Sequence, residues 1–193
     1  MLNIVNVGYD STNYYVIETD KAKLLIDIGW PGTLPKLLHA LKRIGIPLSD
    51  ITHLLVTHYH PDHAGLAQEL KQKGVKLIVL ENQVAAIPAL KQYMKPECNY
   101  VDITPNDNLH VQIGKSRLFL HRLGIDGEII ITPGHTDDSI TLILDTGVAF
   151  TGDLPPESEA EYLASPVQQS WEQIRAYNAH VAYPGHGPGQ ELT

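Results

Sequence analysis

Apolar residues along the first half of the chain alternate between two kinds of spacing. Short runs at 2–7, 13–19 and 23–28 are rich in β-branched and aromatic residues and are separated by Gly, Asp and Lys, which predicts three strands. From Leu34 to Ile44 the apolar residues recur at helical spacing, between Thr33, which can cap a helix, and Gly45, which can end one. The run at 51–57, "ITHLLVT", then returns to the pattern of a buried strand.

Strand and helix patterns continue to alternate up to about residue 94. We expect a helix at 63–74, a strand at 75–80 and a second helix at 82–94, which Pro88 can kink. This alternation is typical of a sheet covered by helices.

The second half of the chain is rich in predicted strands. They fall at 109–113, 117–123, 128–134, 140–145 and 148–153, and are followed by a helix at 168–178 and a last strand at 180–184. The two halves share an order of strands followed by helices, and no linker separates them. We therefore expect a single domain over 1–193, an α/β fold in which two sheets pack together with helices outside.

Composition excludes several classes of protein. The 193 residues are 43% hydrophobic, which suits a domain with a buried core, but no apolar run approaches the ~20 residues of a membrane span. The net charge of −8 argues against a nucleic-acid partner. The start "MLNIVNVGYD" lacks the pattern of a signal peptide, and Cys98 has no second cysteine to pair with. We expect a cytoplasmic protein that acts on a small molecule, without a membrane partner, in an oligomeric state that the sequence does not reveal.

Residues 56–65, "VTHYHPDHAG", place three histidines and an aspartate within six positions directly after an apolar run. His58 and His60 are two apart, so on an extended segment both imidazoles point the same way and can bind one cation. Asp62 and His63 follow where the chain turns into a helix, and they point at a neighbouring position. This geometry predicts two adjacent metal positions, each still short of ligands.

Three more metal-capable residues follow apolar strands: His135 in "ITPGHT", Asp153 in "AFTGD" and His186 in "AYPGH". Strand ends converge along one edge of a sheet, where α/β sites tend to lie. Asp153 is the natural bridge, because a carboxylate has two oxygens. Taken singly, Asp62 is better explained as a helix N-cap, and the two histidines as polar residues of Pro-Gly turns. The cluster at 58–63 favours metal binding for all of them.

This constellation resembles the metallo-β-lactamase-fold hydrolase superfamily, and "LIDIG" around Asp27 resembles the strand-and-aspartate element of that family. The resemblance implies an αββα sandwich of two mixed β-sheets with helices on the outer faces and a two-metal site between the sheet edges. It also implies the ligand set, with His58, His60 and His135 on the first metal, Asp62, His63 and His186 on the second, and Asp153 bridging.

Within the superfamily, the local sequence is most similar to the glyoxalase II branch, although Gly65-Leu66 replaces its Gly-Gly pair. Lactonases of acyl-homoserine lactones share the ligand set. Zinc β-lactamases typically carry a cysteine or a further histidine where this chain has Asp153, so a true zinc β-lactamase is not expected.

The predicted activity is dinuclear metal-dependent hydrolysis of a small ester, thioester or lactone by metal-bound hydroxide, with Asp62 orienting that hydroxide or relaying its proton. Alternatives are a phosphodiesterase or weak β-lactamase of the same fold, and a diiron redox or metal-binding protein. Imidazole and carboxylate ligands suit two Zn²⁺ ions, while Fe and Mn also accept them.

Two aromatic residues beside the ligands are candidates for substrate contacts. Trp30 in "GWPG" can form an apolar wall, and Tyr59, between two ligands, can donate a hydrogen bond. Each is equally explained by packing, Trp30 on the surface and Tyr59 in the interior.

Overall fold

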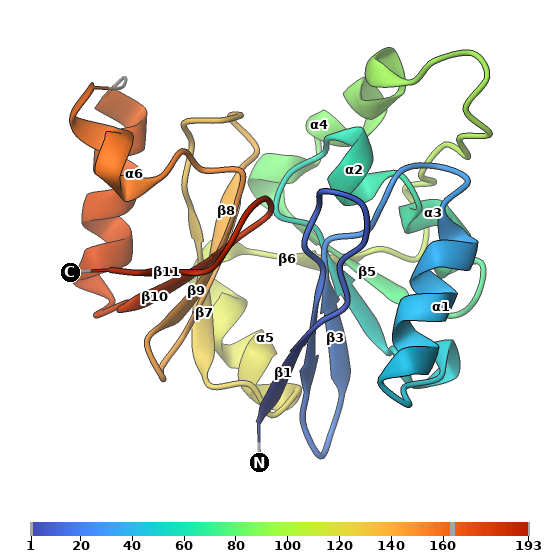
Figure 1. Cartoon of the computed structure of the whole chain (residues 1–193), viewed down its shortest axis with the longest axis horizontal. Coiled ribbons are helices and arrows are strands. Elements are labelled where there is room, and N and C mark those ends of the chain that lie inside the picture. The colour runs from blue at the N-terminus through green and yellow to red at the C-terminus, as the bar shows by residue number, and fades with distance from the viewer. Residues whose placement is uncertain (1, 163–164, 193) are drawn as a thin grey trace.

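The computed structural model, which describes residues 2–162 and 165–192, packs two mixed β-sheets against each other with helices on both outer faces (Figure 1). The first sheet has the order β1-β2-β3-β4-β5-β6, and the second has the order β11-β10-β9-β8-β7. The predicted αββα arrangement is therefore confirmed.

The first sheet begins as an antiparallel meander and continues as parallel strands. β1 pairs with β2 and β2 with β3 in antiparallel register, whereas β3 to β6 run parallel. Its strands are β1 (Asn3–Asn6), β2 (Tyr15–Glu18), β3 (Lys23–Ile26), β4 (His53–Leu55), β5 (Lys76–Leu80) and β6 (Leu109–Val111).

The second sheet is antiparallel except for one pair, because β9 and β10 run parallel. Its strands are β7 (Gly127–Ile131), β8 (Ile140–Leu144), β9 (Val148–Gly152), β10 (Val181–Pro184) and β11 (Gln190–Glu191). Since β7 and β9 are both antiparallel to β8, the carboxyl ends of β7, β9 and β10 all lie at the same edge.

Three apolar clusters correspond to the layers of the sandwich. Along β5, Leu77 and Val79 pack towards the outer helices, while Ile78 and Leu80 pack into the cluster shared with the second sheet. Side chains of a strand alternate between faces, so a strand with helices on one side and a sheet on the other must be apolar throughout. This explains the continuous apolar runs of the sequence.

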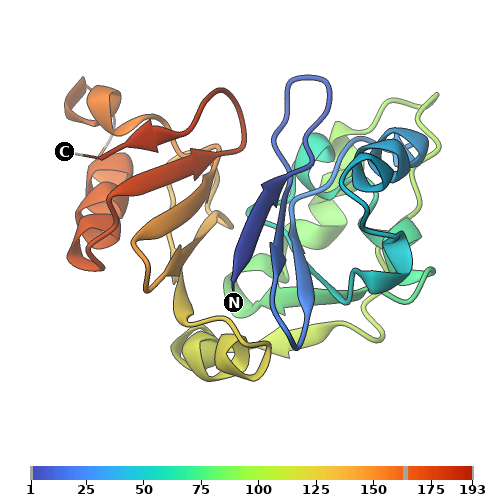
Figure 2. The same ribbon diagram turned by 60° about the horizontal axis from the view of Figure 1, so that its bottom comes forward.

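The helices cover the outer faces and one end of the sandwich. On the first sheet lie α1 (Leu34–Arg43), α2 (Pro61–Ala64) and α3 (Ala67–Lys71), and α6 (Ser165–Ala176) covers the second (Figure 1). Figure 2 shows α5 (Ser116–Arg122) across the end of the sandwich beside the β2–β3 turn, whose Thr19 hydroxyl donates to the Leu123 carbonyl at 2.7 Å.

The segment 117–123 forms helix α5, so the prediction of a strand there is wrong. Leu120 is fully buried and Leu123 nearly so, three positions apart, whereas Leu118 is exposed; this is the spacing of a helix with one buried face. Gly124, at φ +78°, ends the helix in the left-handed conformation that glycine adopts most easily.

Two predicted helices are divided into shorter pieces. The segment 63–74 gives α2 and α3 with a break at Gly65-Leu66, and 82–94 gives α4 (Ala86–Ala89) between 3₁₀ turns at Glu81–Gln83 and Leu90–Tyr93. Gln83 contributes to the second division, because its buried amide turns inward and donates to the Val56 carbonyl at 2.9 Å.

Thr33 stands before α1 as predicted, but its side chain makes no capping bond. Its hydroxyl donates instead to the Trp30 carbonyl at 2.6 Å.

None of the helices in the described ranges combines the length and the apolar character that crossing a membrane requires.

The assignment of α5 as a helix with one buried face can be tested by two leucine substitutions. Leu120→Ala should lower the free energy of unfolding by about 2–5 kcal/mol, because it removes a fully buried side chain. Leu118→Ala, on the exposed face of the same helix, should change it by no more than ~0.5 kcal/mol. Urea unfolding measures both values, and equal losses would contradict the assignment.

Candidate metal centre

The seven predicted ligands all lie beyond the carboxyl ends of strands. His58, His60, Asp62 and His63 follow β4, His135 follows β7, Asp153 follows β9 and His186 follows β10. Close sheet-to-sheet contact brings the two sets together, since the Ile140 amide at the start of β8 donates to the Thr57 carbonyl after β4 at 2.9 Å.

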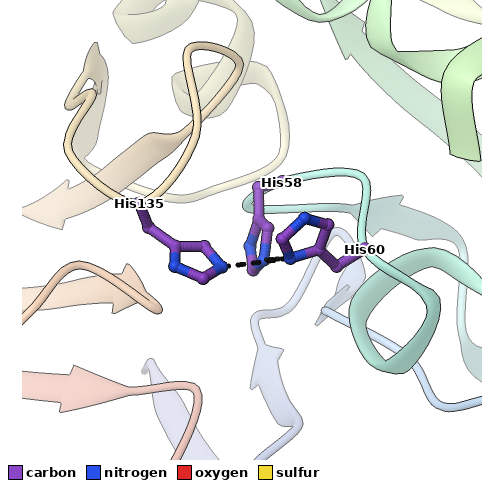
Figure 3. Close-up of side chains that lie close together, drawn as sticks. All are labelled: His58, His60 and His135. Atoms are coloured by element: carbon purple, nitrogen blue, oxygen red, sulfur yellow. Dashed lines mark hydrogen bonds between the residues drawn. The ribbon is translucent and has the colours of Figure 1, made fainter. Parts of the chain in front are cut away.

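The first group consists of His58, His60 and His135 (Figure 3). The Nδ1 atom of His60 lies 3.1 Å from Nε2 of His58 and 3.0 Å from Nε2 of His135. All three ring nitrogens lie within 4.8 Å of one another, so each can direct a lone pair to one point.

The second group consists of Asp62, His63 and His186. The Oδ2 atom of Asp62 lies 3.1 Å from Nε2 of His186 and 3.6 Å from Nε2 of His63. His63 is fully buried, whereas His186 is exposed, so the second group opens towards solvent.

Asp153 lies between the two groups. Its Oδ1 atom is 3.2 Å from Nε2 of His63, and its Oδ2 atom is 3.7 Å from Nε2 of His135 and 3.5 Å from Nε2 of His186. One carboxylate therefore faces histidines of both groups, which is the position a bridging ligand requires.

The electrostatics of the centre fit bound cations. Burial, with the neighbouring histidines, lowers the pKa of His58 well below its ordinary value, so His58 is neutral and its lone pair is free to bind a metal. Burial alone would also lower the pKa of His63, but Asp27 and Asp153 outweigh it and raise the pKa to about 10. The negative charges of Asp27 and Asp153, which hold a proton on His63 this strongly, also favour a bound cation beside it. Moreover, the buried atoms His63 Nε2 and Asp153 Oδ1 make no well-formed hydrogen bond.

Asp27 orients His63 from behind. Its buried carboxylate accepts hydrogen bonds from the Thr57 amide at 2.6 Å and from the Thr57 hydroxyl at 2.8 Å. Its Oδ2 atom lies 2.9 Å from Nδ1 of His63, so the Nδ1 proton faces Asp27 and Nε2 faces the centre. Asp27, at the end of β3, thus aligns His63, which follows the neighbouring strand β4.

The turn between β1 and β2 supports the other two ligands of the second group. The Ser11 carbonyl lies 2.7 Å from Nδ1 of His186, and the Thr12 hydroxyl donates to Asp62 Oδ2 at 3.3 Å. The Asn13 amide side chain donates to the carbonyls of Pro184 and Gly187, on both sides of His186. The sequence alone does not identify these residues, because a polar turn such as "STN" carries no sign of what it contacts.

Two glycines permit the close approach of the strand ends. A Cβ atom on Gly185 would lie 2.5 Å from Asp153 Oδ1 and 2.6 Å from Cε1 of His63. A Cβ atom on Gly152, which has φ +56°, would lie 2.5 Å from the Thr57 hydroxyl. Any larger residue at either position would push the two sheets apart at the centre.

The N-cap alternative for Asp62 does not describe the structure. His60 and not Asp62 occupies the N-cap position of α2, and the carboxylate of Asp62 turns towards His63 and His186. His135 lies in a bend after β7 and His186 in an isolated antiparallel bridge with Thr12, and their ring nitrogens face Asp153.

The two predicted substrate contacts differ in position. Trp30 is 40% exposed on the β3–α1 connection, where a substrate contact stays a prediction. Tyr59 is buried in the cluster between the first sheet and its helices, and its backbone amide donates to Asp138 at 2.8 Å. The side chain of Tyr59 is therefore packed in the interior, where the buried phenol is not available to a substrate.

A family model described as the metallo-beta-lactamase superfamily matches residues 7–186, which include the whole ligand set. The chain belongs to this superfamily. A metallo-beta-lactamase family protein from Thermus thermophilus superposes with a TM-score of 0.74 over 98% of this chain and 74% of that one, at 21% identity, which confirms the fold.

Curated relatives match over most of the chain. A probable metallo-hydrolase of Methanocaldococcus jannaschii is 28% identical over 97% of this chain and 92% of its own length. An atrochrysone carboxyl ACP thioesterase of Claviceps purpurea is 28% identical over 96% of this chain and 56% of its own length. The chain spans about half the length of other curated relatives, 49% and 56% for two lactamase-like proteins.

The role of the β1–β2 turn can be tested by metal titration. Thr12→Val should weaken binding of a divalent cation at the second group about tenfold, because Asp62 loses the hydrogen bond that orients it. Ser11→Ala is the matched control, since Ser11 contacts His186 through its backbone carbonyl, which the substitution keeps. Competition with a chromophoric chelator measures both affinities. An unchanged affinity in Thr12→Val would contradict the role of the hydroxyl.

Proposed function

We propose that this protein is a hydrolase with two divalent cations that cleaves a small ester, thioester or lactone. The observation that carries the proposal is the pair of three-residue groups, each with ligand atoms within 4.8 Å of one another, with Asp153 facing both. His58, His60 and His135 would hold one cation, Asp62, His63 and His186 the other, and Asp153 would bridge them.

The comparisons support hydrolysis as the reaction and are compatible with an acyl substrate. The relative from Methanocaldococcus jannaschii is named as a probable metallo-hydrolase, and the relative from Claviceps purpurea as a thioesterase. For the metal we propose zinc, because five imidazoles and two carboxylates suit its preference for nitrogen and oxygen ligands, although iron and manganese accept the same set.

Divalent cations held by these ligands would supply Lewis-acid chemistry: they would acidify an attacking water and polarise the substrate carbonyl. Asp62 then has the position to accept a proton from the attacking water and pass it to the leaving group, because its half-buried carboxylate lies in the centre beside exposed His186. The Thr12 hydroxyl orients this carboxylate, and Asp27 keeps Nε2 of His63 directed inward.

The rival functions differ in the bond that is cleaved or in the metal. A phosphodiesterase or a weak β-lactamase of the same fold would cleave other bonds with the same ligands, and a diiron redox protein would contain iron. A panel of thioester, lactone, phosphodiester and β-lactam substrates, with metal analysis of the purified protein, distinguishes all of them.

The role of Asp62 gives the sharpest test of the mechanism. At saturating zinc, Asp62→Asn should lower kcat on the best substrate of the panel by roughly 10²–10⁴-fold, because the amide cannot accept the proton. Asp102→Asn, which alters a surface ion pair with Lys91, is the matched control and should keep full activity. Wild-type kcat in Asp62→Asn would contradict the proton relay. A panel without any ester, thioester or lactone hydrolysis by the zinc-loaded wild type would overturn the proposed function.

A further inference from the structure

A cavity of ≈ 310 Å³ opens beside the metal centre on the side of the second sheet. His135, Asp153 and His186 are part of its lining, so the cavity adjoins a histidine of each ligand group and the carboxylate between them. The rest of the wall consists of Gly152, Leu154, Pro155, Pro156, Pro184 and Gln190. Its volume is at the lower limit of small-molecule sites, ~300–1,000 Å³, which suits a short chain of atoms.

The wall is apolar and firmly held. Leu154 is 4% exposed and belongs to the cluster that packs the second sheet against α6. The indole of Trp171 donates to the Pro155 carbonyl at 2.8 Å, which fixes the segment after Asp153 to α6. The wall is therefore formed before any ligand enters.

No lysine or arginine is among the described residues that line the cavity. Its polar side chain beyond the ligands is Gln190, which is uncharged. Arg175 of α6 lies behind the segment after Pro156, but its guanidinium is occupied by both carboxylate oxygens of Glu157. Glu191, which follows Gln190, adds a negative charge at the edge of the sheet.

An apolar wall without a cationic side chain among the described lining residues favours an apolar substrate group over a negatively charged one. An acyl group whose carbonyl lies at the metal centre would extend its chain along Leu154 and the prolines, where burial of apolar surface is favourable. A carboxylate at the far end of the same chain would lose its water without gaining a cationic partner, which is costly. The cations of the centre would attract the reacting carbonyl at the near end and not the distal group.

We propose that this cavity is the acyl subsite of the enzyme and that it selects short, uncharged, apolar acyl groups over acyl groups with a distal carboxylate. Gln190 is the residue of the wall that sets this preference, because its uncharged amide occupies the position where a basic side chain would pair with an acidic substrate. This inference rests on the proposed hydrolysis of esters or thioesters.

Butyryl and succinyl thioesters with the same thiol test the proposal, because they differ by a methyl group against a carboxylate at the same position. The zinc-loaded wild type should hydrolyse the butyryl thioester with a kcat/KM at least about tenfold above that of the succinyl thioester. Gln190→Lys should lower this ratio about fivefold or more, since the ammonium can pair with the succinyl carboxylate.

Glu191→Gln is the matched control. It changes the net charge by the same +1, but its side chain lies on the opposite face of β11 from Gln190. The butyryl-to-succinyl ratio of this variant should stay within about twofold of the wild type, because surface charges act weakly at a distance.

Each result decides between the two proposals. Equal hydrolysis of both thioesters by the wild type, or an equal shift of the ratio in both variants, would overturn the acyl subsite and leave the hydrolase intact. Hydrolysis of neither thioester, nor of a lactone or phenyl acetate, would instead overturn the proposed function and the subsite with it.

Discussion

The convergence of seven metal-capable side chains at the junction of the two sheets is the constraint on which the rest of this structure depends. The ligand atoms of His58, His60 and His135 lie within 4.8 Å of one another, and so do those of Asp62, His63 and His186. The Asp153 carboxylate faces histidines of both groups. Imidazole lone pairs and carboxylates packed this closely repel one another unless a positive charge lies among them. The glycines that let the strand ends approach, and the clusters that pack sheet on sheet, serve to hold this arrangement.

The two halves of the centre are supported in different ways. The first group relies on neighbouring residues after β4, joined by His135 across the sandwich. The second group depends on both ends of the chain, since the β1–β2 turn holds His186 through Ser11 and Asp62 through Thr12 (Figure 1). The second group is therefore complete only when the β1–β2 turn and the end of β10 lie together. The cavity that we assign to the acyl chain is lined by His135, Asp153 and His186, so it adjoins the exposed histidine of each group.

The sequence revealed those features that depend on local chemistry. The spacing of His58, His60, Asp62 and His63 was sufficient to predict neighbouring metal positions, and the strand ends at His135, Asp153 and His186 were visible as glycine-punctuated apolar runs. The features that could not be predicted from the sequence depend on tertiary contacts. The segment 117–123 has the local pattern of a strand. It forms a helix in the structure, where Leu120 and Leu123 both pack into the apolar cluster between the two sheets. Likewise, the partners of Ser11 and Thr12 come from distant parts of the chain, and no local pattern encodes them.

The number of zinc ions bound per chain tests the central claim most directly. Protein stripped with a chelator and titrated with zinc should bind two equivalents, and His186→Ala, which removes a ligand of the second group alone, should bind one with undiminished affinity. Binding of a single equivalent by the wild type, or of none, would contradict a centre built for two cations.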